Sequence, residues 1–497
     1  MKKCFSLIFA VAIIASLSLD SCSKESQSEN APIKEYRIII PVNNPSTKAV
    51  TENSDHNKLI STFKTTEDVY IAKEGSIFND TLHPASEGKE TISFTGTFTG
   101  SSFAAGDIIT VLYNTNKDGV VNYSSQDGSI DNVIDAGKGE NVVITSISDD
   151  IITTSSATLE NLQSIFKFTF KCGSNEISGI RFVRIFSENN KLISQYNVLT
   201  NSPTYGPITI SRSDNLPNNY IYSALRFDSN PGDVIVFQVI DENGKVYSGS
   251  KTAPSGGFLN GKFYAPTVDV NLYTFTVASG KKVYFSPGDL GAEVVNSQYI
   301  YSFTEPFTHW GQTNTTNYNN ATDAKAVSKR TWFDFYFESG LRENFSLYGI
   351  NNWRIPKRLG SGVDTYEWNY LVNSRTTMSV GVDRYYKITI PGHLYCLLLP
   401  PDETQASDIG SDISSGTVTD YLKYIGKGFV LLYNTGTASY SGGWKWNNSS
   451  DFRADQGYYW TWYNTSNRYY FTWPDAGPKV DWGSNRMRNH IRYVHDV

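Results

Sequence analysis

The pattern of apolar and polar positions over residues 35–275 predicts short β-strands rather than helices. Residues 91–99 (TISFTGTFT) alternate with a period of two, as a strand with one buried face does. Residues 36–42, 107–113 and 164–170 are runs rich in β-branched and aromatic residues, which also favour strands. Short strands at this spacing predict β-sandwiches, and the segment is long enough for two of them.

One predicted pair of strands is a hairpin. Residues 234–240 and 245–247 are apolar strand segments, and the turn-forming pair Asn243-Gly244 lies between them. This arrangement predicts two adjacent antiparallel strands in the second half of the β-rich segment.

The C-terminal part of the chain has a mixed pattern. Residues 365–375 place Trp368, Leu371 and Val372 on one helical face, with Thr365 as a candidate N-cap. Residues 418–425 predict a second short helix that ends at Gly426. The other segments read as short strands and long loops. The pattern therefore predicts a compact α+β domain.

The tryptophans separate these two parts of the 497-residue chain. All ten lie between Trp310 and Trp482, and residues 23–309 contain none. Together with the strand pattern, this distribution predicts a mainly β protein with a first sandwich at residues 35–160, a second sandwich at 161–275 and a Trp-rich domain at 276–497.

The N-terminal residues have the features of an export signal. Lys2 and Lys3 precede an apolar run over residues 5–19 that is too short for a retained membrane helix. Leu19-Asp20-Ser21-Cys22 resembles the lipobox of bacterial lipoproteins, which implies acylation of Cys22. The polar segment SKESQSENAP after Cys22 is typical of a flexible tether. These features predict a lipoprotein signal peptide at residues 1–21 and a tether at 22–34. The alternative is a secreted protein in which Cys22 has no such role.

The β-rich part resembles the fimbrillin family of Bacteroidetes. The resemblance lies in TKAV at residues 47–50, GDIITVLYN at 106–114 and LNGKFYAPTVDVNL at 259–272. Members of this family are outer-membrane lipoproteins of type V pili, built from two transthyretin-like β-sandwiches that assemble by donor-strand exchange. The resemblance implies that residues 36–42 are a removable strand and that Lys48 is a protease-processing site. The alternative is an exposed lysine beside a strand that stays in place.

The C-terminal part resembles the Fibrobacter-type paralogous domain, whose fold is related to C-type lectin-like folds. The resemblance lies in an ordered series that includes NWRIPK at residues 352–357, YEWNYL at 366–371 and GYYW at 457–460. It implies a C-type-lectin-like fold for residues 276–497. The insertion around residues 356–362 departs from the family pattern.

Several aromatic residues of this domain are candidate ligand contacts. They lie in Asn-, Ser- and Gly-rich stretches, where a ring can stack on a sugar or a protein epitope while amides and hydroxyls donate hydrogen bonds. Trp353, Trp368 and Trp460 are instead expected in the core, because they lie inside fold-defining motifs. The candidates are Trp444, Trp446, Trp462, Tyr463 and Trp473. The alternative is that they are core residues, and half or more of them are expected in the core.

Composition excludes several other functions. A net charge of −6 without a basic block argues against a nucleic-acid partner. After removal of the signal, only Cys172 and Cys396 are left besides Cys22, so no disulfide framework is expected. No metal-ligand spacing or nucleophile motif is present. We expect no enzyme activity and no cofactor, and the sequence leaves calcium open.

These observations predict an outer-membrane lipoprotein on the cell surface. The expected role is that of a fimbrial tip subunit and adhesin that presents the C-terminal domain. Its expected partners are other pilin subunits, bound by donor-strand exchange, and a glycan or protein on a host or bacterial surface. The alternatives are a stand-alone surface glycan-binding lipoprotein, a pilus anchor and, from the enzyme class, a surface glycan hydrolase.

Overall fold

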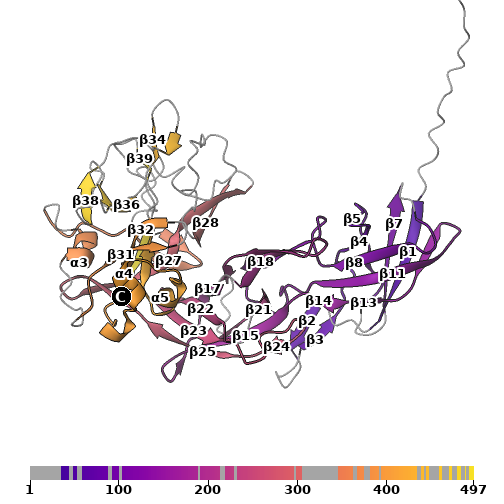
Figure 1. The fold of residues 1–497 in the computed structure, drawn as a ribbon, viewed down its shortest axis with the longest axis horizontal. Helices are drawn as coiled ribbons and strands as arrows, with labels where there is room; N and C mark the ends of the chain where they lie inside the picture. Colours follow the sequence, from indigo (N-terminus) through magenta and orange to yellow (C-terminus); the bar gives the residue numbers. More distant parts are fainter. Residues whose placement is uncertain are drawn as a thin grey trace, which may run out of the picture.

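The structure is a computed structural model. It is elongated and mainly β, with the strands nearest the N-terminus at one end and the C-terminal strands and helices at the other (Figure 1). The predicted fold class, a mainly β protein with sandwich-like sheets, is confirmed. The structure describes residues 35–43, 49–52, 59–87, 92–99, 103–187, 191–212, 219–228, 232–295, 298–304, 345–361, 366–373, 381–390, 393–433, 438–440, 444–446, 458–461, 469–472, 478–482, 487–488 and 492–497.

The first sheet contains ten strands of the described chain, with the main order β5-β4-β8-β11-β12-β1-β7-β6. The predicted strands at 36–42, 91–99 and 107–113 are β1, β7 and β8. One apolar core of Ile, Val, Leu and Phe side chains lies within this unit. The strands are β1 (Glu35–Asn43), β4 (Val69–Lys73), β5 (Ser76–Ile77), β6 (His83–Pro84), β7 (Ile92–Thr99), β8 (Ile108–Tyr113), β11 (Gly137–Ser148), β12 (Ile151–Thr154), β13 (Ala157–Thr158) and β14 (Glu160–Asn161); β2 (Ala49–Glu52) and β3 (Leu59–Thr62) form a separate pair.

The second sheet contains thirteen described strands. It includes the predicted hairpin as β22 and β23, whose turn glycine, Gly244, has a φ of +76°. The sequence pattern did not reveal that β9 and β10 join this sheet by pairing with β18 and β20. The strands are β9 (Val120–Asn122), β10 (Ser125–Gln126), β15 (Ser164–Cys172), β16 (Asn175–Glu176), β17 (Ile180–Ser187), β18 (Leu192–Asn197), β19 (Ser202–Tyr205), β20 (Ile208–Ser211), β21 (Tyr220–Phe227), β22 (Val234–Asp241), β23 (Val246–Thr252), β24 (Phe263–Tyr264) and β25 (Thr267–Leu272).

The C-terminal residues form several small sheets and short helices. The described sheets are β26-β27-β28 with β40, β29-β30, β31-β32-β33, β35-β34-β39 and β36-β37-β38. Their strands are β26 (Phe275–Ala278), β27 (Lys281–Val295), β28 (Gln298–Thr304), β29 (Phe345–Leu347), β30 (Ile350–Trp353), β31 (Tyr386–Ile390), β32 (His393–Leu399), β33 (Val430–Leu432), β34 (Ala438–Tyr440), β35 (Trp444–Trp446), β36 (Tyr458–Thr461), β37 (Tyr469–Thr472), β38 (Lys479–Trp482), β39 (Met487–Arg488) and β40 (Arg492–Asp496).

The two predicted helices are both present: the first is described over part of the predicted range 365–375, with the candidate N-cap Thr365 outside the described residues, and the second is shorter than expected. The first is α3 (Glu367–Asn373), and the second is α5 (Leu422–Gly426); η6 (Ala406–Asp408) and α4 (Ser411–Ser415) precede α5. Gly416 ends α4 in the left-handed conformation, and Thr417 then forms a parallel bridge with Thr389 of β31. The Thr389 N–H donates to the Gly416 carbonyl at 2.8 Å, and the Val418 N–H donates to the Thr389 carbonyl at 2.9 Å. This pairing removes the first turn of the predicted helix. Among the described residues, no helix is long and apolar enough to cross a membrane.

Candidate functional site

Strand β1 lies in the interior of the first sheet although it comes from the beginning of the described chain. It pairs antiparallel with β7 over eight positions, from Glu35 opposite Thr99 to Val42 opposite Ile92. On its other side it runs parallel to β12, with Arg37 opposite Ile151, and then to β13. The chain therefore places its first described strand between neighbours that come from later in the sequence.

The inward face of β1 supplies a central part of the first core. Ile38, Ile40 and Val42 are fully buried and belong to the same apolar cluster as Phe94 and Phe98 of β7. Their spacing of two follows from the strand geometry, which turns alternate side chains to the same face. At the start of the strand, the rings of Tyr36 and Phe103 pack in a T-shaped arrangement, with centroids 6.1 Å apart. β1 therefore fills an apolar groove between β7 and β12.

Loss of β1 would open this groove on two sides. The backbone of β7 would lose its ladder to β1, and the backbone carbonyl of Asp150 would lose the N–H of Arg37, which donates to it at 2.8 Å. Burial of three aliphatic side chains contributes roughly 5–9 kcal/mol, at about 1.5–3 kcal/mol each. That amount is similar to the whole stability of an ordinary domain, about 5–15 kcal/mol. The first sandwich therefore depends on having a strand in this position.

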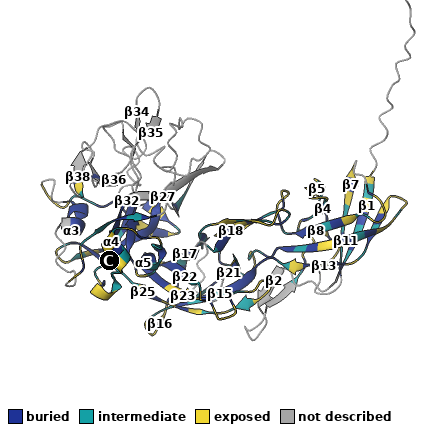
Figure 2. Ribbon diagram, in the orientation of Figure 1, coloured by how far each residue is buried: buried dark blue, intermediate teal, exposed yellow. Residues whose placement is uncertain are grey.

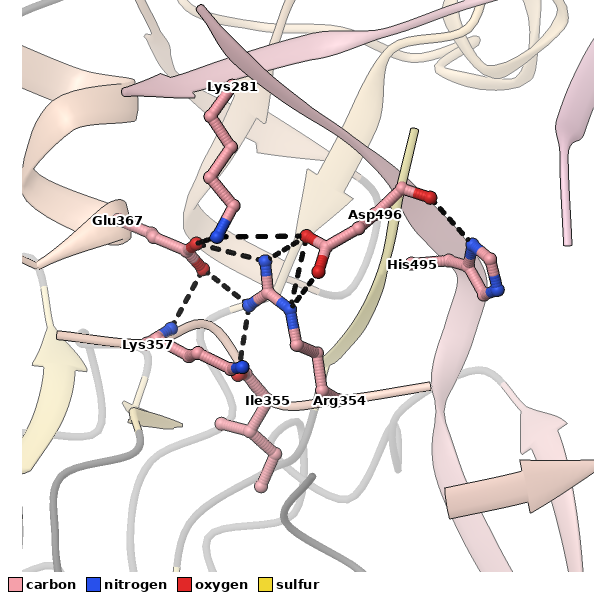
Figure 3. A network of polar contacts seen from close by, with 7 residues as sticks. All are labelled: Lys281, Arg354, Ile355, Lys357, Glu367, His495 and Asp496. Carbon is pink, nitrogen blue, oxygen red and sulfur yellow. Dashed lines mark hydrogen bonds and ion pairs between the residues drawn. The ribbon is translucent and has the colours of Figure 1, made fainter. Parts of the chain in front are cut away.

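The second feature is a polar network in the C-terminal domain, where buried charges join distant parts of the chain (Figure 3). Arg354, which follows β30, donates from both terminal nitrogens to Glu367 of α3, at 2.7 and 2.9 Å. Its Nε lies 3.1 and 3.2 Å from the carboxylate oxygens of Asp496 in β40. Arg354 is 2% exposed and Glu367 is fully buried, so the fork-to-fork pair is shielded from water.

The remaining groups of this network bind the carboxylate of Glu367. The backbone N–H of Lys357 donates to its Oε2 at 2.8 Å, and Nζ of Lys281 lies 3.5 Å from its Oε1. Arg354 also pairs through its backbone with Val494, in both directions, at 2.8 and 2.9 Å. The network thus connects the start of β27, the end of β30, α3 and β40. Because its charged centre is buried, we assign it to holding the domain together rather than to ligand binding.

The ionic partners shift the pKa values in this network. Burial disfavours the charged form of Arg354, but hydrogen bonds to Asp496 and Glu367 outweigh this and raise its pKa. Burial likewise acts to raise the pKa of Asp496, but the hydrogen bond and charge of Arg354 outweigh it and lower that pKa. The folded state therefore favours the ionised carboxylate of Asp496.

The lowered pKa of Asp496 gives a pH-dependent contribution to stability. A carboxyl whose pKa is lower in the folded than in the unfolded state stabilises the fold above its ordinary pKa, which is about 4. The contribution is lost as the pH falls through the folded-state value. We expect Asp496→Asn to lower the unfolding midpoint at pH 7, and we expect the difference from wild type to shrink as the pH falls below about 4. Denaturant unfolding followed by tryptophan emission measures this difference in the midpoint. A difference that grows as the pH falls would contradict the stabilising role of ionised Asp496.

A further buried group of polar side chains joins β27, β36 and β40. The Arg492 guanidinium lies 3.1 Å from a carboxylate oxygen of Asp289, and the Tyr459 hydroxyl donates to the other oxygen at 3.2 Å. The same hydroxyl accepts the N–H of Tyr433 at 3.2 Å. Burial raises the pKa of Tyr459 well above its ordinary value, so this hydroxyl stays protonated. Like the Arg354–Glu367 pair, this group is buried, and we assign it to the stability of the fold.

The predicted core tryptophans are placed as expected where the structure describes their side chains. Trp353 and Trp368 are both fully buried. The ring of Trp368 stacks on Phe471, with centroids 4.7 Å apart. Cys396 is also fully buried and packs in an apolar cluster, as a small hydrophobe does. Trp460 lies in β36, and its side chain lies outside the described residues.

The predicted ligand contacts stay predictions. Trp444 and Trp446 are the first and last residues of β35, which pairs with β34, and their side chains are outside the described part of the chain. Trp462, Tyr463 and Trp473 lie outside the described residues altogether, as do Cys22 and Lys48. Lys48 falls between the end of β1 and the start of β2. Over the described ranges, no group of three or more His, Cys, Asp and Glu side chains is arranged to hold a metal ion.

Sequence reasoning missed the Arg354 network, although its parts lie in quoted motifs. Arg354 lies in NWRIP and Glu367 lies in YEWNY, but neither motif indicates that the two side chains meet. In both motifs a charged residue lies beside aromatic residues that are buried. Because a buried charge requires a partner, this pattern was the available signal that the two charges pair.

Comparison with known proteins identifies no family. No family model matches the chain, and no curated protein matches it. Solved structures of proposed adhesion proteins are similar at low identity. One from Bacteroides uniformis is 15% identical, covers 48% of this chain and 96% of its own, and has a TM-score of 0.28. A proposed adhesin from Bacteroides ovatus is 14% identical over 55% of this chain and 98% of its own, with a TM-score of 0.24.

A third similar structure is described as proposed polysaccharide-binding proteins from Bacteroides thetaiotaomicron. It is 10% identical, covers 54% of this chain and 98% of its own, and has a TM-score of 0.25. Identities and TM-scores this low do not assign a family or an activity. No family name therefore follows from the comparisons.

Proposed function

We propose that the chain is a cell-surface lipoprotein that joins a fibre by strand exchange and presents its C-terminal domain as an adhesin at the fibre tip. The observation that carries the proposal is the position of β1. A strand from one end of the described chain, with three fully buried aliphatic residues, fills a groove between β7 and β12. Such a strand can be replaced by one from another subunit that offers the same backbone and apolar pattern.

Removal of β1 requires a cut in the segment that follows it. Lys48 lies in this segment, five residues after the end of β1 at Asn43. A trypsin-like protease that cuts after Lys48 would separate β1 from the rest of the sandwich. Because β1 makes only non-covalent contacts with β7, β12 and β13, the released strand is then free to exchange.

Strand β40 is not free to be donated to another subunit. A subunit that continues a fibre must release a strand to its neighbour, whereas β40 is part of the C-terminal core. Tyr493 and Val494 are fully buried, and Arg492 and Asp496 belong to the two ionic networks. Release of β40 would open both networks. The chain is therefore suited to accept a strand and unsuited to donate this one.

The remaining parts of the proposal concern the two ends of the molecule. Acylation of Cys22 would anchor the chain in the outer membrane before assembly, since two or more acyl chains give stable membrane attachment. The aromatic candidates Trp444, Trp446, Trp462, Tyr463 and Trp473 would supply stacking surfaces for a surface glycan or protein. Calcium is not required by this proposal.

The proposal is tested on the protein from cells. Surface fibres are sheared off and purified, and the N-terminus of the chain in that fraction is determined by mass spectrometry. We expect a chain that starts at residue 49 in the fibres and an acylated Cys22 in the membrane-bound precursor. Fibre-bound chains that still begin at Cys22 would contradict the exchange of β1. Intact chains found only in membranes would favour the anchor or the stand-alone glycan-binding lipoprotein.

Adhesive function needs a separate test. The full chain is applied to a glycan array and to immobilised surface proteins, with a variant carrying Trp444→Ala and Trp462→Ala as the comparison. Binding that the variant loses, with an unchanged unfolding midpoint, would support these rings as ligand contacts. Loss of stability in the variant would instead assign the rings to the core.

A further inference from the structure

The second sandwich is apolar on the outside as well as on the inside. On β17, Val183 and Ile185 face the sandwich interior, whereas Phe182 and Phe186 belong to clusters outside it. On β22, Val239 faces the interior. Consequently nearly every residue of these two strands is buried, as the dark blue of β17 and β22 shows (Figure 2). Burial on both faces requires a second layer over the outer face.

The C-terminal domain provides this layer through two mixed apolar clusters. One cluster combines Phe182 of β17 with residues of the C-terminal domain, and the Phe182 ring stacks on Tyr348 with centroids 4.7 Å apart. The other cluster combines Phe186 and Val236 with apolar residues of β31, β32 and α5. Further members of the two clusters are Ile240, Val246, Tyr284, Leu290, Phe303, Trp353, Ile388, Leu398 and Ile425.

A row of polar side chains lies between these two clusters and fixes how the layers meet. Arg184 of β17, Gln238 of β22 and Ser248 of β23 are in register across the sheet, and each is buried. The guanidinium of Arg184 donates to the carbonyl of Pro287 in β27 at 3.1 Å. A buried charge is costly unless its hydrogen bonds are made, so this contact favours one relative position of the two layers.

Two glycines lie in direct contact with aromatic side chains, where no Cβ fits. Gly244, in the β22–β23 turn, has a φ of +76°, and a Cβ there would lie 2.6 Å from the ring of His495 in β40. Gly428 has a φ of +78°, and a Cβ there would lie 2.2 Å from the ring of Tyr273, which connects β25 to β26. Both positions therefore need glycine for conformation and for space.

The first sandwich does not share its core in this way. Its apolar cluster consists of residues between Ile38 and Leu159. Its described contributions to the core of the second sandwich, apart from residues of β9 and the segment that surrounds it, are Leu112 of β8 and Ala136, with the partly buried Tyr70 of β4 and Ile77 of β5 packed against that core. The shared apolar packing is thus concentrated at the junction between the second sandwich and the C-terminal domain.

We propose that the second sandwich and the C-terminal domain form one cooperative unfolding unit, and that the first sandwich is a separate unit. Cooperativity follows because neither partner can open without exposing the mixed clusters and the Arg184 row. This inference does not depend on the adhesive role. It implies that residues 276–497 alone would expose a large apolar face, so binding experiments require the full chain.

The tryptophans allow a direct test in the full chain. All ten lie in the C-terminal part, so tryptophan emission reports unfolding there alone. Val239→Ala makes a cavity inside the second sandwich, and Val111→Ala makes a matched cavity inside the first; both side chains are fully buried. We expect Val239→Ala to move the tryptophan-detected midpoint to lower denaturant concentration and Val111→Ala to leave it unchanged.

Either of two results would overturn the proposal. One is an unchanged tryptophan midpoint for Val239→Ala while hydrogen exchange shows faster opening of β22. The other is an equal shift for Val111→Ala, because the chain would then unfold as a single unit. If a variant fails to fold, hydrogen exchange of the wild-type chain still tests the proposal. Amides of β22 and β32 should open with the same free energy, and amides of β8 with a different one; different values for β22 and β32 would contradict the shared unit.

Discussion

A chain that begins at residue 49, and therefore lacks β1, should have an unfolded first sandwich until another strand fills the groove. The three buried side chains Ile38, Ile40 and Val42 contribute roughly 5–9 kcal/mol through burial, at about 1.5–3 kcal/mol each. An ordinary domain has a total stability of about 5–15 kcal/mol. We expect the amides of β7 and β12 to lose their protection from hydrogen exchange, whereas amides of β22 and β32 keep theirs.

A synthetic peptide of residues 35–43 (EYRIIIPVN) should restore this protection. The peptide recreates the eight-position ladder to β7 and the parallel contacts to β12. A control peptide with Ile38→Asn and Ile40→Asn keeps the backbone hydrogen bonds but places amides in the apolar groove, so it should not restore the fold. Equal rescue by both peptides would mean that the groove does not select an apolar strand. Full protection without any peptide would mean that β1 is dispensable.

Arg354→Met should lower the free energy of unfolding of the C-terminal domain by about 3–5 kcal/mol, because it leaves the buried carboxylate of Glu367 without its main partner. Met retains much of the apolar stem of Arg354, so most of the loss comes from the charge and hydrogen bonds. Lys281, 3.5 Å from Glu367, compensates only in part. Denaturant unfolding followed by tryptophan emission measures the change.

The matched control is Arg384→Met, which changes a half-buried arginine outside this network. A surface substitution of this kind should stay within about 0.5 kcal/mol of wild type. A double variant with Arg354→Met and Glu367→Gln should recover part of the loss, since it removes the unpaired charge as well as its partner. If Arg354→Met lowers the free energy of unfolding as little as the control does, the network is not a major source of stability.

Local patterns in the sequence predicted much of the fold. The strands β1, β7, β8 and β15 were predicted because alternation and β-branched runs are local properties of a strand. The β22–β23 hairpin was predicted from its turn residues. Strands β9 and β10 were not, because elements of two or three residues carry no measurable period. The pairing of Thr389 with residues 416–418, which shortens the predicted second helix, is a long-range contact that local propensity cannot show.

The sites were less predictable than the strands. Residues 36–42 were predicted to form the exchangeable strand, but only the structure shows that this strand lies between β7 and β12. Arg354 meets partners 13 and 142 positions away, a pairing that no local pattern reports. The run Val234–Ile240 is almost continuously apolar, which indicates burial on both faces, but it does not identify the C-terminal domain as the covering layer. The aromatic ligand contacts stay predictions.

The central claim, that β1 leaves its groove when the chain joins a fibre, is tested most directly by crosslinking β1 in place. Arg37 of β1 and Thr97 of β7 are directly opposite each other and both exposed, so the double variant Arg37→Cys/Thr97→Cys can form a disulfide without disturbing the core. The measurement is the amount of this variant in sheared fibres relative to each single-cysteine variant. The account predicts that the oxidised double variant is exported but absent from fibres and that reduction restores its entry. Equal amounts of the crosslinked chain and the single variants in fibres would contradict it.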